Sequence, residues 1–281
     1  MGMKRVGMKM NSPGAREEQA EPAPKRIVVA LDASSHSLAA LRAAAELAAQ
    51  LQAELHGLFV EDANLLRLCE LPFFQEVGLF SARPRRIESQ ALERQFRALA
   101  RSLREQMARV AEAAHVPWTF RVTRGSVADE LLAAAEEAQL LSLGRLGQGS
   151  GKRAGSATEF IVRRTRRPVL VMSRHEQFRP PLTLVYTGSP ASERALELAV
   201  RLAERMDKQL HLVLPMPQAD AEQASIQLRQ RIRSVEFHVI RVDDSDRFAQ
   251  LLQTLGRRAV IMPAEYAELL PLLNGPVLLT P

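Results

Sequence analysis

The sequence predicts an α/β fold made of two tandem domains, each with a mostly parallel five-stranded sheet and helices on both faces. Three observations lead to this prediction. The chain has 281 residues, a length that suits two domains. Short apolar runs alternate with amphipathic segments through the first half, and the same pattern then returns at a constant offset.

The first copy begins with a strand at 26–31. Asp32 directly follows this strand, and a helix with an apolar stripe comes next. Strands that alternate with helices of ten or more residues indicate right-handed βαβ units and a parallel, Rossmann-like sheet. The expected strands are 26–31, 53–60, 117–123, 139–143 and 168–173, and the expected helices are 36–50, 88–114, 127–138 and 155–166.

The second copy is recognised by an offset of 155 residues, which relates Ser34 to Ser189 and Leu41 to Leu196. The last strands, 168–171 and 276–279, are only 108 apart, so the second copy lacks 47 residues before its last strand. We therefore expect a disordered tail at 1–24, one domain at 25–178 and a degenerate domain at 179–281. The final strands, 168–173 and 276–280, are the expected contact edges, because pairing would cover their exposed backbone.

Composition limits the class of protein. The formal net charge is +6, with most of the excess between residues 25 and 178, which is a weak indication of a polyanionic partner. No apolar run is long enough to span a membrane, and the tail lacks the apolar stretch of a secretory signal. Cys69 is the only cysteine, which excludes an internal disulfide and suits a reducing compartment. We expect a cytoplasmic protein without a membrane partner.

Ligands of parallel sheets bind beyond the carboxyl ends of the strands, so the loops there are the candidate sites. Asp32 stands at the end of the first strand, where a carboxylate suits a sugar hydroxyl or a metal, or caps the next helix. The loop from Gly144 to Ser156 holds five glycines before a helix, together with Lys152 and Arg153. Free backbone amides, a helix N-terminus and nearby cations are typical of a phosphate site, and a flexible surface loop is the alternative.

Taken together, these residues resemble the universal stress protein family. The resemblance rests on Asp32, on Val60 at the end of the second strand, and on the final Pro-Val-Leu-Val-Met strand. It also rests on Gly144-x-x-Gly147 followed by Gly155-Ser156, and it covers residues 25–281 as a tandem pair. It implies ATP or a related nucleotide as the ligand, with Mg²⁺ only as its counter-ion. Asp32 would contact the nucleoside, Val60 the adenine, and Gly144, Gly147, Gly155 and Ser156 the phosphates.

The sequence departs from the family pattern in two places. Only seven residues separate Gly147 from Gly155, two fewer than the pattern has. In the second copy Thr187 stands where Asp32 stands, and no Gly-x-x-Gly segment precedes the last strand. We therefore expect the second domain to have lost the site and to serve as a packing partner that mimics the family's dimer.

Other residues carry weaker predictions. The apolar insertion at 64–80 suits a lid, a partner surface or a small core of its own, and Cys69 within it is expected to be buried. His36 is expected to face solvent at the start of its helix, and the alternative is that it reaches the phosphates from its loop. No histidine set has metal-ligand spacing, and no nucleophile with a base is recognisable, so neither a metal site nor an enzyme is predicted.

The resulting expectation is a stress-response regulator or scaffold that binds a nucleotide and forms a homodimer. Two alternatives remain. One is a dimerisation scaffold that binds no nucleotide. The other is a basic nucleic-acid-associated protein, but Arg97 on the basic face of the long helix has an acidic partner at Glu93, which is typical of an ordinary solvated face.

Overall fold

The fold is described from a computed structural model, which covers residues 25–70, 76–77, 84–85, 89–145, 156–174, 177–206, 209–255 and 257–281. In the first half, strands and helices alternate as the sequence predicts, with most boundaries within two residues. The principal elements are β1 (Arg26–Ala30), α1 (Ser35–Leu51), β2 (Glu54–Asp62), α3 (Ser89–Ala113), β5 (Trp118–Gly125), α4 (Val127–Glu136), β6 (Leu140–Gly144), α5 (Ser156–Arg164) and β7 (Val169–Met172).

The second half repeats this order until its last helix, which is replaced by a 3₁₀ segment, η1. Its elements are β8 (Leu182–Val185), α6 (Pro190–Arg205), β9 (Gln209–Pro215), α7 (Gln218–Arg231), β10 (Glu236–Val242), α8 (Ser245–Thr254), β11 (Val260–Pro263), η1 (Ala264–Leu272) and β12 (Val277–Thr280).

The strands of both halves form one ten-stranded sheet, in the order β10-β9-β8-β11-β12-β7-β6-β1-β2-β5. Within each half the strands are parallel and follow the same order, with the third strand of the half at the outer edge and the fifth at the centre. At the centre β7 pairs with β12 in antiparallel fashion, with Leu170 opposite Leu278. The α/β fold with a mostly parallel sheet is confirmed, but the two expected sheets are continuous because their last strands pair.

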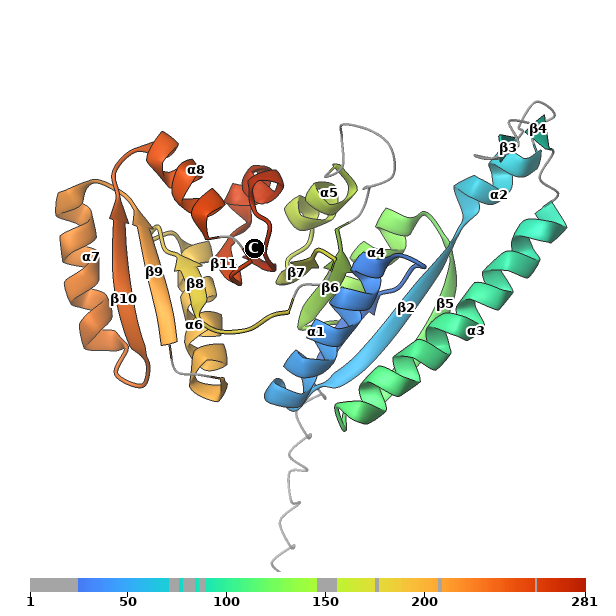
Figure 1. Ribbon diagram of the computed structural model, residues 1–281, viewed down its shortest axis with the longest axis horizontal. Coiled ribbons are helices and arrows are strands. Elements are labelled where there is room, and N and C mark those ends of the chain that lie inside the picture. Colours follow the sequence, from blue (N-terminus) through green and yellow to red (C-terminus); the bar gives the residue numbers. More distant parts are fainter. Residues whose placement is uncertain are drawn as a thin grey trace, which may run out of the picture.

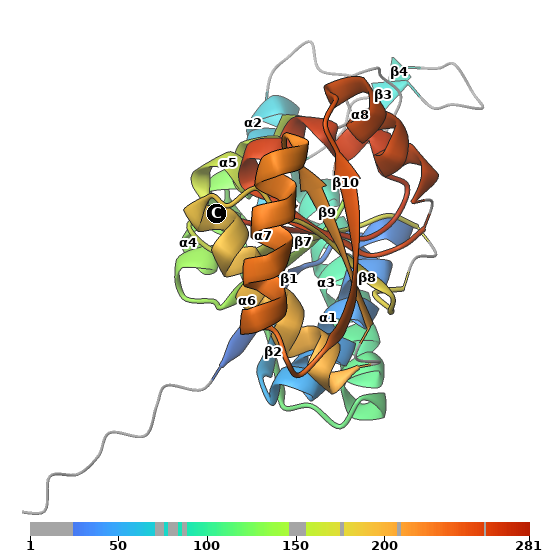
Figure 2. The same ribbon diagram turned by 90° about the vertical axis from the view of Figure 1, so that its left-hand side faces the viewer.

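The sheet separates two layers of helices (Figure 1). One core contains side chains of α1, α3, α6 and α7, and the other contains side chains of α4, α5, α8 and η1. Corresponding helices of the two halves therefore cover the same face. Figure 2, which looks at the end of the second half, shows α7 beside the outer strands β9 and β10.

The insertion between β2 and α3 contains α2 (Ala63–Glu70) and a two-stranded ladder of β3 (Glu76–Val77) with β4 (Pro84–Arg85). Cys69 is 5% exposed and has no disulfide, which confirms the expectation of a buried thiol. Leu65 and Leu68 of α2 are exposed. Residues 71–75 and 78–80 of the predicted 64–80 segment lie outside the described residues, as does the tail at 1–24. In the described ranges, no helix is long and apolar enough to cross a membrane.

Candidate functional site

The turn after β1 positions Asp32 at the carboxyl edge of the sheet. Its carboxylate Oδ1 accepts a hydrogen bond from the Ser34 amide at 2.8 Å, which forms an Asx turn. The Oγ of Ser34 accepts from the Ser37 amide at 3.1 Å, so Ser34 is the N-cap of α1. The alternative in which Asp32 itself caps the helix is therefore wrong, because Ser34 lies closer to the first helical amides. Asp32 fixes the turn and stays half-buried beyond the strand end.

Gly144 ends β6 directly against the start of α1. A Cβ at this position would lie 2.6 Å from the Ser37 amide nitrogen and 2.7 Å from the His36 carbonyl carbon, closer than real Cβ atoms come. Glycine is therefore required here by the approach of two backbones. The same approach buries His36, which is only 7% exposed. The expectation that His36 faces solvent was wrong, because the first turn of α1 packs onto the end of β6.

Val60 lies near the carboxyl end of β2, beside the turn that carries Asp32. Just beyond β1, the Leu31 amide donates to the Leu58 carbonyl of β2 at 2.8 Å. The chain therefore leaves β1 beside the last residues of β2, which include Val60. On its other side Val60 is in register with Thr123 of β5. Asp32, Val60 and Gly144 thus come from three neighbouring strands, β1, β2 and β6, and meet at one edge of the sheet.

Two hydroxyl groups near this edge have no partner within the described part of the chain. They are the Oγ of Ser35, in the first turn of α1, and the Oγ1 of Thr123, beside Val60. Both oxygens are buried, and a buried polar atom without a hydrogen bond costs about 1–3 kcal/mol. Such atoms mark a place where a polar ligand would find hydrogen-bonding groups. Sequence reasoning missed both residues, since a serine or threonine at a strand end is too common to attract notice.

The Gly-rich segment is described only at its two ends. Gly144 closes β6, and Ser156 begins α5, nine residues long, whose N-terminus follows the predicted phosphate loop. Gly147, Lys152, Arg153 and Gly155 lie outside the described residues, as does the side chain of Ser156. Their convergence on one anion therefore stays a prediction.

Residues around this segment contact the second half. The Nη2 of Arg145, the residue after Gly144, donates to the Leu273 carbonyl at 2.8 Å. On α5, Arg163 forms an ion pair of 3.2 Å with Glu268 of η1. Arg145, at one end of the Gly-rich segment, and α5, the helix that begins at the other end, therefore both contact the second half at or beside η1. Sequence reasoning missed these contacts, because η1 takes the place of a helix in the shortened second copy and has no helical apolar stripe to reveal it.

The corresponding edge of the second half has the same turn with different chemistry. The Oγ of Ser189 accepts from the Ser192 amide at 3.2 Å, and Pro190 starts α6. Pro263 stands in the register position of Gly144. Two residues later, the Oε1 of Glu265 lies 3.5 Å from the hydroxyl oxygens of both Thr187 and Ser189. A carboxylate of the chain itself therefore sits at the helix start where the first half would receive an anion.

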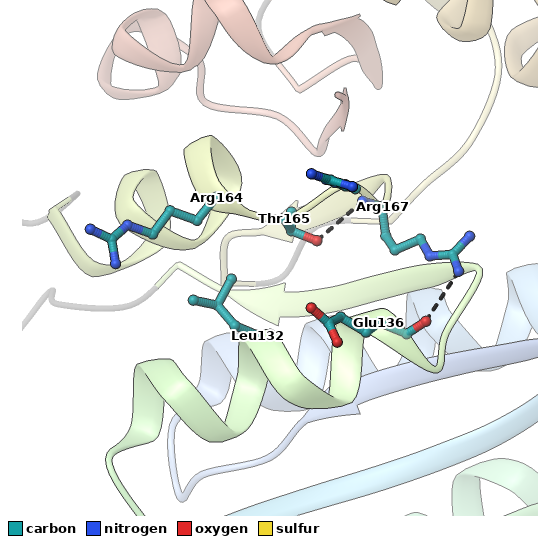
Figure 3. Close-up of a pocket in the computed structure, with 6 residues that line it drawn as sticks. Leu132, Glu136, Arg164, Thr165 and Arg167 are labelled. Carbon is teal, nitrogen blue, oxygen red and sulfur yellow. Dashed lines mark hydrogen bonds between the residues drawn. The ribbon is translucent and has the colours of Figure 1, made fainter.

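Two larger hollows of the described residues lie at the opposite edge, where the strands of the first half begin. One of about 710 Å³ opens between the C-terminal ends of α4 and α5 (Figure 3). In it the Arg167 guanidinium donates to the Glu136 carbonyl at 3.1 Å, and the Arg164 side chain points the other way. Arg164 lies over the ring of Phe160. None of the sequence-predicted site residues lines this hollow.

Solved structures with the same fold extend over nearly the whole chain. A universal stress protein from Archaeoglobus fulgidus superposes with a TM-score of 0.70 at 16% identity, covering 91% of this chain and 95% of its own. A functionally unknown protein from Pseudomonas aeruginosa PAO1 gives 0.58 at 15% identity, covering 92% of both chains. A putative universal stress protein from Pseudomonas aeruginosa UCBPP-PA14 gives 0.56 at 15% identity, covering 92% of this chain and 93% of its own. At such identities the likeness concerns the fold.

Family assignment comes from the sequence itself. No curated protein matches this chain. The model of the Universal stress protein family, in contrast, matches residues 24–173, which is more than half of the chain and includes Asp32, Val60 and the Gly-rich segment. The match ends one residue beyond β7, the last strand of the first half. The chain belongs to the universal stress protein family.

Proposed function

We propose that the first half binds ATP or a related nucleotide at the carboxyl edge of β1, β2 and β6, and that the protein acts as a stress-response regulator or scaffold. The observation that carries this proposal is the half-buried Asp32 carboxylate, held by the Ser34 amide next to Gly144. The partnerless hydroxyls of Ser35 and Thr123 at the same edge add hydrogen-bonding capacity for a polar ligand.

The family resemblance assigns the roles. The free oxygen of the Asp32 carboxylate would accept a hydrogen bond from a sugar hydroxyl, and the backbone near Val60 would face the adenine. The amides at Gly144, Gly147, Gly155 and Ser156 would enclose the phosphates, with Lys152 and Arg153 offsetting their charge. Mg²⁺ would accompany the phosphates only as their counter-ion.

The second half, residues 179–281, is proposed to be a degenerate domain of the same family and the packing partner of residues 25–178. Its strand order repeats that of the first half, and its last strand pairs with β7. Pro263 and Glu265 occupy the places where a nucleotide site needs glycine and an open helix start. We propose that this pairing within the chain takes the place of a contact between family subunits, and that further association gives a homodimer.

We propose that the protein is cytoplasmic and that it binds its ligand without acting as an enzyme. Neither a nucleophile with its base nor an orienting group is assigned at the carboxyl edge, so any hydrolysis of bound ATP would be slow and incidental. Ordering of the Gly-rich segment by phosphates is the proposed switch. It would reach the second half through Arg145 and through Arg163 on α5.

Titration with a fluorescent ATP analogue tests the proposal. Wild-type protein should give saturable binding, and Gly155→Val, which places a side chain where the phosphates need open backbone, should abolish it. Thr187→Val, a substitution at the equivalent of Asp32 in the second half, is the matched control and should bind like the wild type. No saturable binding, or binding indifferent to Gly155→Val, would favour the scaffold without a nucleotide.

The nucleic-acid alternative has its own measurement. Retention of the protein on DNA that falls steeply as salt rises would support it, because displaced counter-ions give such a slope. The proposal expects retention to be weak and equal for the wild type and for an Arg101→Gln, Arg104→Gln variant of the exposed face of α3.

A further inference from the structure

A basic groove runs between the two halves, at the amino ends of β1, β6 and β7 and beside the carboxyl end of β12, on the opposite edge of the sheet from Asp32. Its volume is about 420 Å³. Apolar side chains such as Ile27 and Leu198 form part of its lining, along with Glu197, its one carboxylate side chain. The six cationic side chains that line it are Lys25, Arg166, Arg167, Arg194, Arg201 and Arg205.

Most of this positive charge is not neutralised. Over the described ranges, the side chains of Lys25, Arg166 and Arg201 form neither an ion pair nor a hydrogen bond with the protein. Arg167 donates to the carbonyl of Glu136 at 3.1 Å, and Arg205 donates to the carbonyl of Gln50. Arg194 donates through its Nε to an oxygen of Pro281, which also lines the groove, at 2.9 Å. Bonds to carbonyl oxygens fix a guanidinium in place without removing its charge, and arginine does not lose its proton in proteins.

Both halves contribute to the groove. Lys25 precedes β1, and Arg166 lies between α5 and β7. The arginines of the second half all belong to α6, at positions 194, 201 and 205, whose spacings of seven and four place them along one face of the helix. The pairing of β7 with β12 brings these two sets together. The groove is therefore a property of the joined halves, and neither half forms it alone.

The lining indicates the chemistry of the ligand. No aromatic side chain lines the groove, so it offers no platform on which a base could stack, as sites for single-stranded nucleic acid do. Its volume lies within the range of small-molecule sites. With Arg194 held by Pro281, the remaining five cations against the one carboxylate side chain still exceed what a single anionic group would neutralise. Arginine is also the side chain best matched to phosphate oxygens.

We propose that this groove binds a small anion that carries several phosphate groups, of which inorganic tripolyphosphate is the simplest. The site is separate from the nucleotide site proposed above and does not depend on it. Phosphate groups would lie between Arg166 of the first half and Arg201 of the second. No protein group neutralises either of these two side chains over the described ranges. Bound in this way, the anion would bridge the halves.

Isothermal titration calorimetry with sodium tripolyphosphate at constant ionic strength tests the proposal. The full chain should bind one tripolyphosphate per chain with saturation. The double variant Arg166→Gln, Arg201→Gln should weaken that binding at least tenfold, since it removes two charge-assisted contacts. Both side chains are exposed and partnerless, so the variant should keep the wild-type melting temperature and circular dichroism spectrum.

The matched control is Arg101→Gln, Arg104→Gln on the exposed face of α3, which removes the same charge far from the groove. It should bind tripolyphosphate like the wild type. The proposal is overturned if the wild type shows no saturable binding, or if the control loses as much affinity as the groove variant. It is also overturned if a twenty-residue oligothymidylate binds the groove more tightly than tripolyphosphate, because the ligand would then be a nucleic acid.

A third variant separates this proposal from the nucleotide site. Gly155→Val, which blocks the phosphate part of the nucleotide site, should leave tripolyphosphate binding unchanged. Loss of tripolyphosphate affinity in Gly155→Val would place the anion at the Gly-rich segment and contradict the groove assignment.

Discussion

The turn after the first strand is built in the same way in both halves, yet it presents different groups to a ligand. In each half a serine caps the next helix and a second serine stands three residues later: Ser34 and Ser37, and Ser189 and Ser192. Asp32 adds a carboxylate in the first half, and Thr187 adds only a hydroxyl in the second. The hydrogen bonds that the fold requires are therefore kept in both copies, and the group suited to a ligand is present in one.

The segment after the fourth strand differs far more. In the first half Gly144 leads into the Gly-rich loop and α5, whereas in the second Pro263 leads directly into η1. With η1 in place of the loop and helix, Glu265 lies at the N-terminus of α6. There its carboxylate is 3.5 Å from the hydroxyl oxygens of Thr187 and Ser189. A carboxylate of the chain itself therefore lies at the N-terminus of α6, where negative charge is favoured.

The largest expected effect distinguishes two glycines. Gly144→Ala should lower the free energy of unfolding by about 3 kcal/mol, because the new Cβ would meet backbone atoms that cannot move independently. Gly188→Ala, in the turn of the second half, should cost only about 1 kcal/mol. Gly188 has a φ of +78° but open space around its Cβ position. Urea denaturation followed by circular dichroism measures both values.

Equal losses in the two glycine variants would contradict the close contact between β6 and α1. A Gly144→Ala variant with wild-type stability would show in addition that His36 and Ser37 are not packed onto the strand end.

The second prediction compares the two strand-end residues. Asp32→Asn should weaken binding of fluorescent ATP about tenfold, since it removes a charged acceptor worth about 1.5–3 kcal/mol. Asn keeps an oxygen that can accept from the Ser34 amide, so the turn should remain intact. Thr187→Val should leave the dissociation constant unchanged. A loss of affinity in Thr187→Val that matches Asp32→Asn would place a nucleotide in the second half instead.

A third prediction concerns a polar cluster that only the second half has. The Glu193 carboxylate accepts hydrogen bonds from the Tyr186 hydroxyl at 2.6 Å and from the Arg231 guanidinium at 2.7 and 3.0 Å. In the first half, the repeat places Leu38 at the position of Glu193 and Leu31 at that of Tyr186. The hydrogen bonds from Arg231 lower the pKa of Glu193. At pH 7, Glu193→Gln should cost about 1 kcal/mol, a modest value because both partners are partly exposed.

The same cluster has a defined pH dependence. Because the folded state lowers the pKa of Glu193, its contribution is complete above the ordinary value of 4.5 and is lost as the pH falls through the folded pKa. The difference between the wild type and Glu193→Gln should therefore shrink between pH 5 and about pH 3. Glu204→Gln, at an exposed position of the same helix, is the control and should change stability little. A difference that stays constant with pH would refute the ion pair.

The smallest expected effect involves His56 and His211, which the repeat relates to each other. Burial lowers the pKa of both, helped by Arg26 and Arg121 at His56 and by Arg258 and His238 at His211. The unfolded chain therefore binds more protons, and stability should fall as the pH drops below about 6.5.

His211→Gln should reduce that loss of stability. Between pH 7 and pH 5.5 its melting temperature should fall by roughly 1 °C less than that of the wild type, because the site is only partly buried. His56→Gln, in the first half, should reduce the fall in melting temperature by a similar amount. Variants that lose as much stability as the wild type would exclude these histidines as the cause.

Most of the fold is predictable from the sequence, because the signals that fix it are local. The apolar runs and helical stripes define strands and helices, and the 155-residue offset applies the same topology to the second half. The matching segments at 168–171 and 276–279 mark the two strands that pair at the centre.

The site is less predictable, because its geometry depends on contacts between distant segments. The burial of His36 follows from the approach of α1 to Gly144, more than a hundred residues away. Likewise, Glu265 meets Thr187 only because β11 lies beside β8. The unpaired hydroxyl of Thr123 has no local signature at all.

Hydrogen exchange measured by mass spectrometry, with and without saturating ATP, tests the central claim that only the first half holds a nucleotide. The account predicts slower exchange in peptides covering residues 32–37 and 142–158. Peptides covering the equivalent residues 187–192 and 263–266 should exchange at unchanged rates. Protection of the second set, or no protection in the first, would contradict it.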